Sequence, residues 1–419
     1  MAYSEQLLAA SRQQFPALSR QWQGQSVAYF DGPAGTQVPQ GVIDAIAGYL
    51  RHNNANHGGL FATSRDSDRM LHGAHQAVAD LLGTEDSETV VFGPNMTTLT
   101  FALSRALSRT WHSGDEILVT RLDHDANVTP WVLAARDAGV QVRYVGIHRE
   151  DCTLDMEDFR AKLTERTRLV AVGCASNSVG TINPAAEICQ AARAVGAISF
   201  LDAVHFAPHA LLDVATLGCD LLACSAYKFF GPHIGVQWGR RELLEELSPY
   251  KLRPAPNSLP GKWMTGTQNH ECIAGVAAAI DYLADIGYVH AGNYELTRRQ
   301  ALQETFQILG GYERDLAAML LEGLAQIDDV KVWGITSLDR LPERLPTVSI
   351  THRKLRPAEM AARLGEQGLF TWHGNYYALQ LSETLGLEPD GMLRIGLVHY
   401  NTRQEVQRLL AAIADLSGE

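Results

Sequence analysis

The sequence predicts an α/β protein with a mostly parallel seven-stranded sheet in a large domain and a smaller α+β C-terminal domain. Up to residue 238, short β-branched and apolar runs alternate with helix-like stretches, which is typical of an open, doubly wound sheet. The runs are almost continuously apolar, as expected of parallel strands that are covered by helices on both faces. A chain of 419 residues also exceeds what one hydrophobic core usually supports.

Seven segments are predicted to form the strands of the large sheet. In chain order they are Val90–Phe92, Glu116–Thr120, Val140–Ile147, Leu169–Cys174, Ile198–Asp202, Leu221–Ser225 and Gly235–Trp238. Helical periodicity lies between them. The helices expected there are Thr97–Arg109, Val128–Asp137, Asp155–Leu163, Ala185–Ala194 and Val214–Leu217.

The pattern changes after residue 238. Ser248 to Gly266 is rich in proline, glycine and serine, which predicts a long irregular connection. Helices follow at His270–Ile286 and from Tyr294 to about Ile327, and then strands and helices at Thr347–Thr351, Pro357–Gln367, Met392–Gly396 and Arg403–Leu416. We predict a large domain over residues 29–290, a small domain over residues 291–419, and an N-terminal helix within residues 1–28 that packs on the small domain.

Composition excludes several classes of protein. A net charge of −12 makes nucleic acid and anionic membranes poor partners. We see neither a secretory signal nor a run of about 18 apolar residues that would span a membrane. The six cysteines form no C-x-x-C pair, which favours free thiols in the cytoplasm. His72/His75 and His205/His209 have the spacing of helical metal ligands, but no third ligand is evident and no metal site is predicted.

Lysine is scarce, and one lysine has unusual neighbours. Only six of the 35 basic residues are lysine, and Lys228 lies in the segment A-C-S-A-Y-K-F-F-G-P. Its amine could extend from a strand end towards water, with its stem on apolar surface. Alternatively, it could be desolvated for chemistry. Both interpretations stay open on this observation alone.

Polar residues follow the predicted strands at their carboxyl ends, where open α/β sheets bind their ligands. The segment G-P-N-M-T after the first strand leads into a helix, and a helix N-terminus can hold a phosphate. The later strand ends supply an imidazole, an amide, a carboxylate and an amine. The residues concerned are Asn95, Met96, Thr97, His124, Asn177, Asp202, His205, Ser225, Tyr227 and Lys228.

Together these groups are the parts that pyridoxal phosphate requires. A lysine forms a Schiff base with its aldehyde, and a carboxylate keeps its pyridine nitrogen protonated so that the ring acts as an electron sink. A flat ring can cover the cofactor, and an anion site can hold its phosphate. Each motif alone is weak, but five of them at successive strand ends predict a pyridoxal-phosphate site.

The residues from Tyr29 to Asn401 resemble the class V aminotransferases of fold type I, the family that contains the cysteine desulfurases. The opening Y-F-D-G-P-A-G-T is similar to Y-L-D-N-A-A-T-T, and D-H-D-A-N-V-T-P-W is similar to E-H-H-x-N-x-x-P-W. S-N-S-V-G-T-I-N-P is similar to S-N-x-x-G-x-x-x-P, and S-A-Y-K to S-x-H-K. R-I-G-L-V-H-Y-N-T, which begins at Arg394, is similar to R-x-S-x-x-x-Y-N-T.

The resemblance implies roles for these residues. Lys228 would be the covalent anchor, His124 would stack on the cofactor ring, and Asp202 would pair with its nitrogen. Further cofactor contacts are implied for Asn95, Met96, Thr97, Asn177, Ser225, Tyr227 and His205, which replaces the glutamine of the family. Thr267 lies in a segment that the family donates from a second subunit, so we expect a homodimer with active sites shared across the interface.

On the substrate side, the resemblance implies that Arg394 forks onto the α-carboxylate of an amino acid. Cysteine desulfurases carry a catalytic cysteine on a loop before this arginine. The corresponding segment here, L-F-T-W-H-G-N-Y-Y-A (residues 369–378), has none. We predict that His373, Asn375 and Tyr376 bind substrate, although the segment could equally be an aromatic cluster between domains. His57 is assigned to the entrance loop, with a loop-capping role as the alternative.

The sequence therefore predicts a pyridoxal-phosphate enzyme that acts on the α-carbon of an amino acid. The preferred reaction is that of a cysteine desulfurase-like C–S β-lyase without a persulfide-forming loop cysteine. An amino-acid epimerase or a class V aminotransferase would use the same residues. A low-turnover cofactor-binding scaffold is the alternative from another class, but it would not need lysine, carboxylate, histidine and arginine together.

Overall fold

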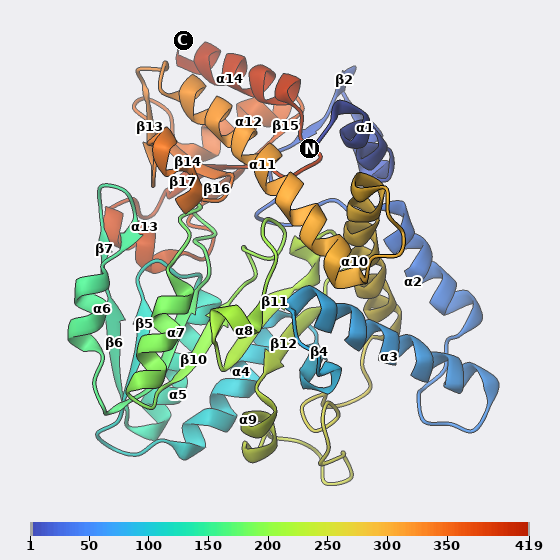
Figure 1. Ribbon diagram of the computed structural model, residues 1–419. Coiled ribbons are helices and arrows are strands. Elements are labelled where there is room, and N and C mark those ends of the chain that lie inside the picture. The colour runs from blue at the N-terminus through green and yellow to red at the C-terminus, as the bar shows by residue number, and fades with distance from the viewer. Residues whose placement is uncertain (1–2, 418–419) are drawn as a thin grey trace.

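The computed structural model describes residues 3–417, whose two main sheets have seven and four strands (Figure 1). The seven-stranded sheet has the order β4-β12-β11-β10-β9-β5-β6, and β12 is antiparallel to both of its neighbours whereas the other pairs are parallel. This confirms the predicted fold class. The strands are β4 (Val90–Gly93), β5 (Glu116–Thr120), β6 (Gln141–Val145), β9 (Thr167–Gly173), β10 (Ile198–Asp202), β11 (Leu221–Ser225) and β12 (Gly235–Gly239).

Helices cover both faces of this sheet because successive side chains on each strand point to opposite sides. On β5, Ile117 and Val119 pack into one cluster and Leu118 into the other. One face is covered mainly by α4 (Met96–Leu107) and α5 (Thr129–Ala138). The other is covered by α3 (Ala62–Leu82), α6 (Met156–Lys162), α7 (Ala185–Ala194) and α10 (His270–Ala291).

The second sheet is antiparallel and has the order β13-β14-β17-β16. Its strands are β13 (Val330–Trp333), β14 (Thr347–His352), β16 (Trp372–Gly374) and β17 (Met392–Gly396). It shares a separate apolar cluster with α12 (Pro357–Glu366), α14 (Arg403–Ser417) and the C-terminal half of α11 (Arg298–Leu324). The N-terminal half of α11 packs on α10 and α3 beside the large sheet, so this helix joins the two parts.

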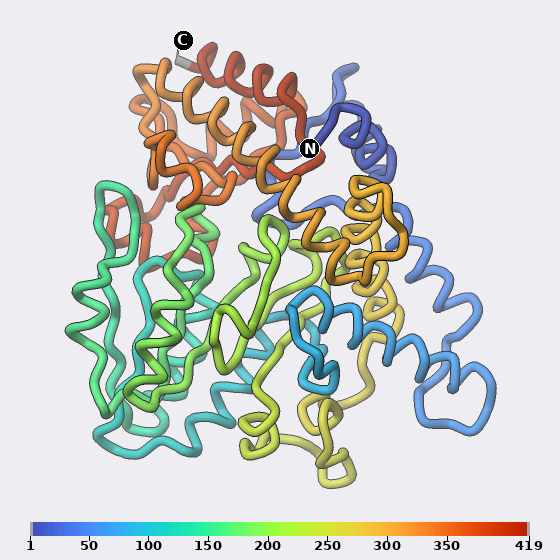
Figure 2. Tube along the Cα trace, in the orientation of Figure 1, coloured from blue at the N-terminus to red at the C-terminus, as the bar shows by residue number. Residues whose placement is uncertain are grey.

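The first segments of the chain lie beside the last ones, as the trace in Figure 2 shows. β3 (Ala28–Tyr29) pairs with β15 (Leu369–Phe370), and Arg12 of α1 (Glu5–Gln13) forms an ion pair with Glu405 of α14. The helix also contacts α10, so it packs against both parts of the molecule rather than against the C-terminal part alone. The domain boundaries at residues 28/29 and 290/291 stay predictions.

Several elements differ in their bounds from the sequence prediction, and shorter elements complete the strands and helices of the described chain. The long helix begins at Arg298 and not at Tyr294, because Thr297 and Gln300 form a capping box. The predicted strand Val140–Ile147 ends at Val145, and β7 pairs with β8 instead. The remaining elements are α2 (Gln40–His52), α8 (Val214–Leu217), α9 (Arg241–Glu246), α13 (Leu379–Leu385), β1 (Gln21–Trp22), β2 (Gln25–Ser26), β7 (Ile147–His148) and β8 (Thr153–Leu154).

Within residues 3–417, one helix is apolar and long enough to cross a membrane, which the sequence prediction did not anticipate. This helix is α10, which is long and apolar enough, but 56% of its most apolar stretch is buried inside the protein. It packs against α2, α3 and α11. Burial on this scale is what a core helix of a globular protein shows.

Candidate active site

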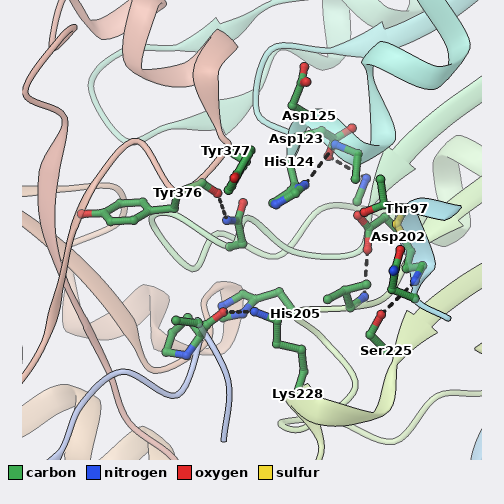
Figure 3. A pocket seen from close by; sticks show the side chains of 18 of the residues that line it. Thr97, Asp123, His124, Asp125, Asp202, His205, Ser225, Lys228, Tyr376 and Tyr377 are labelled. Carbon is green, nitrogen blue, oxygen red and sulfur yellow. Dashed lines mark hydrogen bonds between the residues drawn. The ribbon is translucent and has the colours of Figure 1, made fainter. Parts of the chain in front are cut away.

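A cavity of about 750 Å³ lies at the carboxyl ends of β5, β9, β10 and β11, where the large sheet faces the small one. Figure 3 shows side chains converging on it from both sheets. The structure brings together 14 of the predicted site residues: Asn95, Met96, Thr97, His124, Asn177, Asp202, His205, Ser225, Tyr227, Lys228, His373, Asn375, Tyr376 and Arg394. His57 and Thr267 are not among the lining residues of the described chain.

One end of the cavity is built on the start of α4. The side chain of Asn95 caps the helix by accepting the N–H of Thr98 at 2.8 Å, and the Ser225 hydroxyl accepts the N–H of Met96 at 3.1 Å. Thr97 and Tyr227 also line the cavity. The positive end of a helix dipole, with hydroxyl groups beside it, is a donor set that fits a phosphate.

His124 lies on the loop that follows β5, and its ring is held neutral. Its Nδ1 accepts the backbone N–H of Ala126 at 3.0 Å, so the ring proton is on Nε2. Burial, together with the positive charges of Lys228 and Arg394, lowers the pKa of His124 to about 4. The ring lies 5.5 Å from that of Tyr377, at an angle of 31°. A flat, uncharged imidazole in this position can cover an aromatic ligand.

Two buried carboxyl groups lie at the carboxyl ends of β10 and β5, which flank β9 in the large sheet. Asp202 accepts the N–H of Val204 at 2.9 Å, and burial raises its pKa to about 6 although Lys228 opposes the shift. Asp123 accepts the N–H of Gly173 at 2.7 Å, and burial and nearby Asp202 raise its pKa to about 8. A protonated nitrogen placed against Asp202 would favour its ionised form.

The Lys228 amine faces the cavity from the turn after β11. Its Nζ donates a hydrogen bond to the Pro33 carbonyl oxygen and lies 4.6 Å from the centre of the Tyr227 ring. Burial, followed by the charge of Arg394, lowers the pKa of Lys228 to about 7, whereas Asp202 opposes the shift. A substantial share of the amine is therefore unprotonated at neutral pH. Such an amine can act as a nucleophile or a base.

Arg394 extends from β17 of the small sheet and is only 3% exposed. Its Nη1 donates to the Asn177 carbonyl oxygen at 2.8 Å, and its guanidinium lies 4.2 Å from the centre of the Tyr376 ring. Burial lowers the pKa of Arg394 to about 10, so it stays charged at neutral pH. Its Nε is enclosed and has no hydrogen-bond partner within residues 3–417. The guanidinium as a whole lines the cavity, and its planar fork suits a bound carboxylate.

The segment between β16 and α13 forms the outer wall of the cavity. Tyr376 and Tyr377 are both left-handed, with φ of 55° and 60°. The Tyr376 hydroxyl donates to the Met392 carbonyl oxygen, and the Tyr377 carbonyl oxygen accepts the N–H of Asp125 at 2.7 Å. Tyr377 itself is 72% exposed and Trp372 is 51% exposed. The backbone is therefore tied down while two aromatic rings stay open to solvent.

Comparison with known proteins identifies the family. The sequence model of the class V aminotransferase family matches residues 28–314 and 305–409 of this chain. The chain belongs to this family, whose enzymes depend on pyridoxal phosphate. A cysteine desulfurase of Pectobacterium carotovorum subsp. carotovorum (strain PC1) is 30% identical over 417 residues, and one of Cronobacter sakazakii (strain ATCC BAA-894) is 30% identical over 422 residues. The alignments cover 96% of this chain and 96% of each relative.

Solved structures of cysteine desulfurases share the whole fold. The apo enzyme of Thermococcus onnurineus NA1 has a TM-score of 0.87 and 25% identity, and all of both chains is covered. The Escherichia coli cysteine desulfurase CsdA, described in an S-sulfonic acid form, has a TM-score of 0.83, 26% identity and 98% coverage of both chains. These likenesses confirm that the chain has the fold type I architecture of class V enzymes.

The donor set of this class V chain fits the cofactor of its family. A helix start can hold the phosphate, a buried carboxyl can hold a ring nitrogen, and a desolvated amine can bind an aldehyde. The enclosed Asn177 Oδ1 also lacks a partner in the described part of the chain, so polar contacts remain to be made at this site. The roles assigned to individual residues stay predictions.

Two predicted residues lie elsewhere in this class V chain. Thr267 is exposed on the connection before α10. His57 lies in the loop between α2 and α3, where its Nδ1 is 3.8 Å from an Asp68 carboxylate oxygen and its ring is 5.8 Å from that of His270. Neither residue lines the cavity of its own chain in the described structure.

The sequence prediction gives no role to two acidic residues in or near the cavity. Asp123 lies in the D-H-D-A-N motif and lines the cavity. Asp31 lies in the opening motif, close enough to Arg394 and Lys228 to interact with their charges. Burial raises its pKa to about 6 against the charges of Arg394 and Lys228, and its enclosed Oδ1 has no partner among residues 3–417. Its place in the Y-F-D-G-P-A motif was the only available signal.

Proposed function

We propose that this class V chain holds pyridoxal phosphate on Lys228 and acts at the α-carbon of an amino acid. The reaction we propose is elimination of the β-substituent of a cysteine-type amino acid. One observation carries the proposal: a desolvated amine, a buried carboxyl, a neutral imidazole and an arginine with an unpaired donor line one cavity. The desulfurase names of its relatives support the choice of substrate.

Each part of the cavity has a task in this proposal. The start of α4, with Thr97 and Ser225, would hold the phosphate, Asp202 would hold the proton of the ring nitrogen, and His124 would cover the ring. When bound, pyridoxal phosphate supplies an electron sink that stabilises negative charge at the α-carbon of an amino acid. The buried carboxyl of Asp202 would favour a protonated ring nitrogen, which this sink requires.

The remaining residues would act on the substrate. Arg394 would bind the α-carboxylate, since its guanidinium lines the cavity and stays charged at neutral pH. The Lys228 amine would remove the α-proton, and its lowered pKa suits a base that works near neutral pH. The wall formed by Trp372 to Tyr377 would surround the substrate side chain and exclude water from one side.

The cysteines favour elimination over transfer of sulfur to the protein. No cysteine is among the residues that line the cavity in the described chain. Five of the six thiols are buried, and burial raises the pKa of Cys174 and Cys224, which lie on or just after strands of the large sheet. Such thiols are not thiolates at neutral pH and are poor sulfur acceptors.

A panel of L-amino acids tests the reaction. Purified enzyme is incubated with each amino acid while pyruvate, ammonia, sulfide, alanine, the D-isomer and acceptor-dependent keto acid are measured. Elimination from cysteine consumes one water and gives pyruvate, ammonia and sulfide in equal amounts. Lys228→Ala should abolish this activity, whereas Lys331→Ala, which changes an exposed lysine on β13, should retain it.

Other products would overturn the proposed reaction in distinct ways. Alanine with sulfide would indicate a desulfurase despite the sequence of the 369–378 segment. Racemised substrate without pyruvate would indicate an epimerase, and keto acid only with an added acceptor would indicate an aminotransferase. Bound cofactor without turnover of any amino acid would indicate a scaffold.

We also propose that the enzyme is a cytoplasmic homodimer with shared active sites. Thr267 is exposed and does not line the cavity of its own chain, which supports this because a second copy could use it. Free thiols support the location. Light scattering of the purified protein should give twice the mass of the chain, and a fully active monomer would contradict the proposal.

A further inference from the structure

His205 and Thr347 form a hydrogen bond between the two sheets beneath the cavity. His205 follows β10 of the large sheet, and Thr347 is the first residue of β14 in the small sheet. The His205 Nε2 lies 3.0 Å from the Thr347 Oγ1. Both side chains are buried, and His205 lines the cavity. Figure 3 shows His205 near Lys228 on the cavity wall.

Counting donors decides which way this hydrogen bond runs. Among residues 3–417, the Thr347 hydroxyl makes no other hydrogen bond. If His205 donated from Nε2, the hydroxyl proton of a fully buried threonine would have no acceptor, which is costly. If the hydroxyl donates to Nε2, both groups are satisfied by one bond. The ring proton of His205 is then on Nδ1.

The Nδ1 of His205 is the atom left for a ligand. It makes no hydrogen bond within the described chain. The fully enclosed side-chain atoms without a partner do not include it, so this nitrogen is not enclosed. It must therefore border open space, and the open space beside His205 is the cavity. A neutral imidazole with its proton on Nδ1 would present one N–H donor there.

The charges around His205 keep it neutral. Burial lowers its pKa well below the ordinary value, and electrostatic interactions with His209, Arg394 and Lys228 act in the same direction. The His209 ring is 5.5 Å away, and its Nδ1 lies 2.8 Å from an oxygen of Glu313, with both side chains 2% exposed. This buried pair leaves Thr347 as the hydrogen-bonding partner of His205 in the described structure.

We propose that Thr347 is a positioning residue that fixes His205 as its Nδ1–H tautomer, so that His205 donates a hydrogen bond to an anionic oxygen of the bound cofactor. This rests on the proposed function, because it takes pyridoxal phosphate as the ligand. The donor that faces the cofactor in the large sheet is thereby set by a hydroxyl group in the small sheet. The packing of the small sheet against the large sheet then controls the charge of the cofactor ring.

The test compares Thr347→Val, which removes the hydroxyl at nearly constant volume, with Thr347→Ser, which keeps it. The pH dependence of the visible absorbance of the bound cofactor is measured for each variant. Loss of one hydrogen bond to the ring oxygen should move the midpoint of that titration by about 0.5–1 unit in Thr347→Val. Thr347→Ser should behave as the wild type does.

A second background separates positioning from general damage. In His205→Gln, the amide donates without a choice of tautomer, so adding Thr347→Val should cause no further shift. Histidine-selective ¹⁵N NMR of the apoprotein reports the tautomer directly, and the signal absent from His205→Gln identifies His205. We expect protonated Nδ1 in the wild type and a changed tautomer mixture in Thr347→Val.

The outcomes distinguish the two proposals. A protein that binds no pyridoxal phosphate would overturn the proposed function, whereas the NMR result would still report on Thr347. Bound cofactor with the same titration in wild type and Thr347→Val would overturn this inference alone. A proton on Nε2 in the wild-type apoprotein would also overturn it, as would an equal shift in the His205→Gln background.

Discussion

The two halves of the cavity are built in different ways. The half formed by the large sheet consists of strand ends and a helix start, and most of its polar groups are buried and hydrogen-bonded to neighbouring backbone. The half formed by the small sheet consists of Arg394 and a short segment with two left-handed tyrosines, one buried and one 72% exposed. The first half has the features of a cofactor seat, and the second those of a substrate entrance.

This difference separates what the family shares from what an individual enzyme does. Groups at strand ends are placed by the sheet itself, so their positions follow from the fold. The wall formed by Trp372 to Tyr377 is placed by local backbone conformation and can change without altering the sheet. The reaction of this chain should therefore depend on the small-sheet half, while cofactor binding should depend on the large-sheet half.

Lys228→Ala should have the largest effect on the cofactor half. Turnover should fall by about 10⁴-fold or more, because both the covalent anchor and the base are removed. The visible absorbance of the bound cofactor should disappear as well. Kinetics and absorbance spectra of the purified variant check this. An unchanged spectrum would show that another group holds the cofactor.

The pH dependence of cofactor capture should be the next largest effect. The neutral amine is the nucleophile, and the pKa of Lys228 is about 7. Capture of pyridoxal phosphate by apoprotein should therefore slow about tenfold for each pH unit below 7 and reach a plateau above it. Stopped-flow absorbance measures this rate.

The matched variant for this titration is Arg394→Gln. Removing the positive charge should raise the pKa of Lys228 and move the midpoint to higher pH. A wild-type midpoint near 10.5, the ordinary value for lysine, would contradict the desolvation of the amine.

Arg394→Lys should have a smaller effect that is confined to the substrate half. The ammonium group of lysine, a point charge, replaces the two-pronged guanidinium group of arginine. A hydrogen bond to a charged group is worth about 1.5–3 kcal/mol. We expect KM for the amino acid to rise about 10- to 100-fold while the absorbance of the bound cofactor stays as it is. Arg403→Lys, at an exposed ion pair with Asp315, is the control and should leave KM unchanged. Loss of cofactor in Arg394→Lys would contradict the claim that the small-sheet half binds substrate and the large-sheet half binds cofactor.

Removing one hydroxyl from each of the adjacent tyrosines should give the smallest effects. Tyr376→Phe loses the bond to the Met392 carbonyl and should lower the free energy of unfolding by about 1 kcal/mol. Tyr377→Phe should change it by less than about 0.5 kcal/mol, because that ring is exposed. Chemical denaturation measures both values, and an equal loss in the two variants would mean that the exposed ring also carries structure.

The sequence predicted the cofactor half closely and the substrate half only in outline. Apolar runs placed β5, β10 and β11 at their observed residues, and polar residues at strand ends meet because parallel strands end at one edge. The pairing of His205 with Thr347 joins residues 142 positions apart in two sheets, and no local pattern encodes it. Likewise, the left-handed conformations of Tyr376 and Tyr377 run against residue preference and are imposed by tertiary contacts.

The most direct test of the account is to find where the cofactor is attached. Holoenzyme is treated with sodium borohydride, which fixes pyridoxal phosphate to the amine that holds it, and the digested protein is analysed by mass spectrometry. The account predicts that the modification is on Lys228 alone of the six lysines, and that it is lost in Lys228→Ala. Modification of a different lysine in the native enzyme, or no modification of a protein that shows the cofactor absorbance, would contradict it.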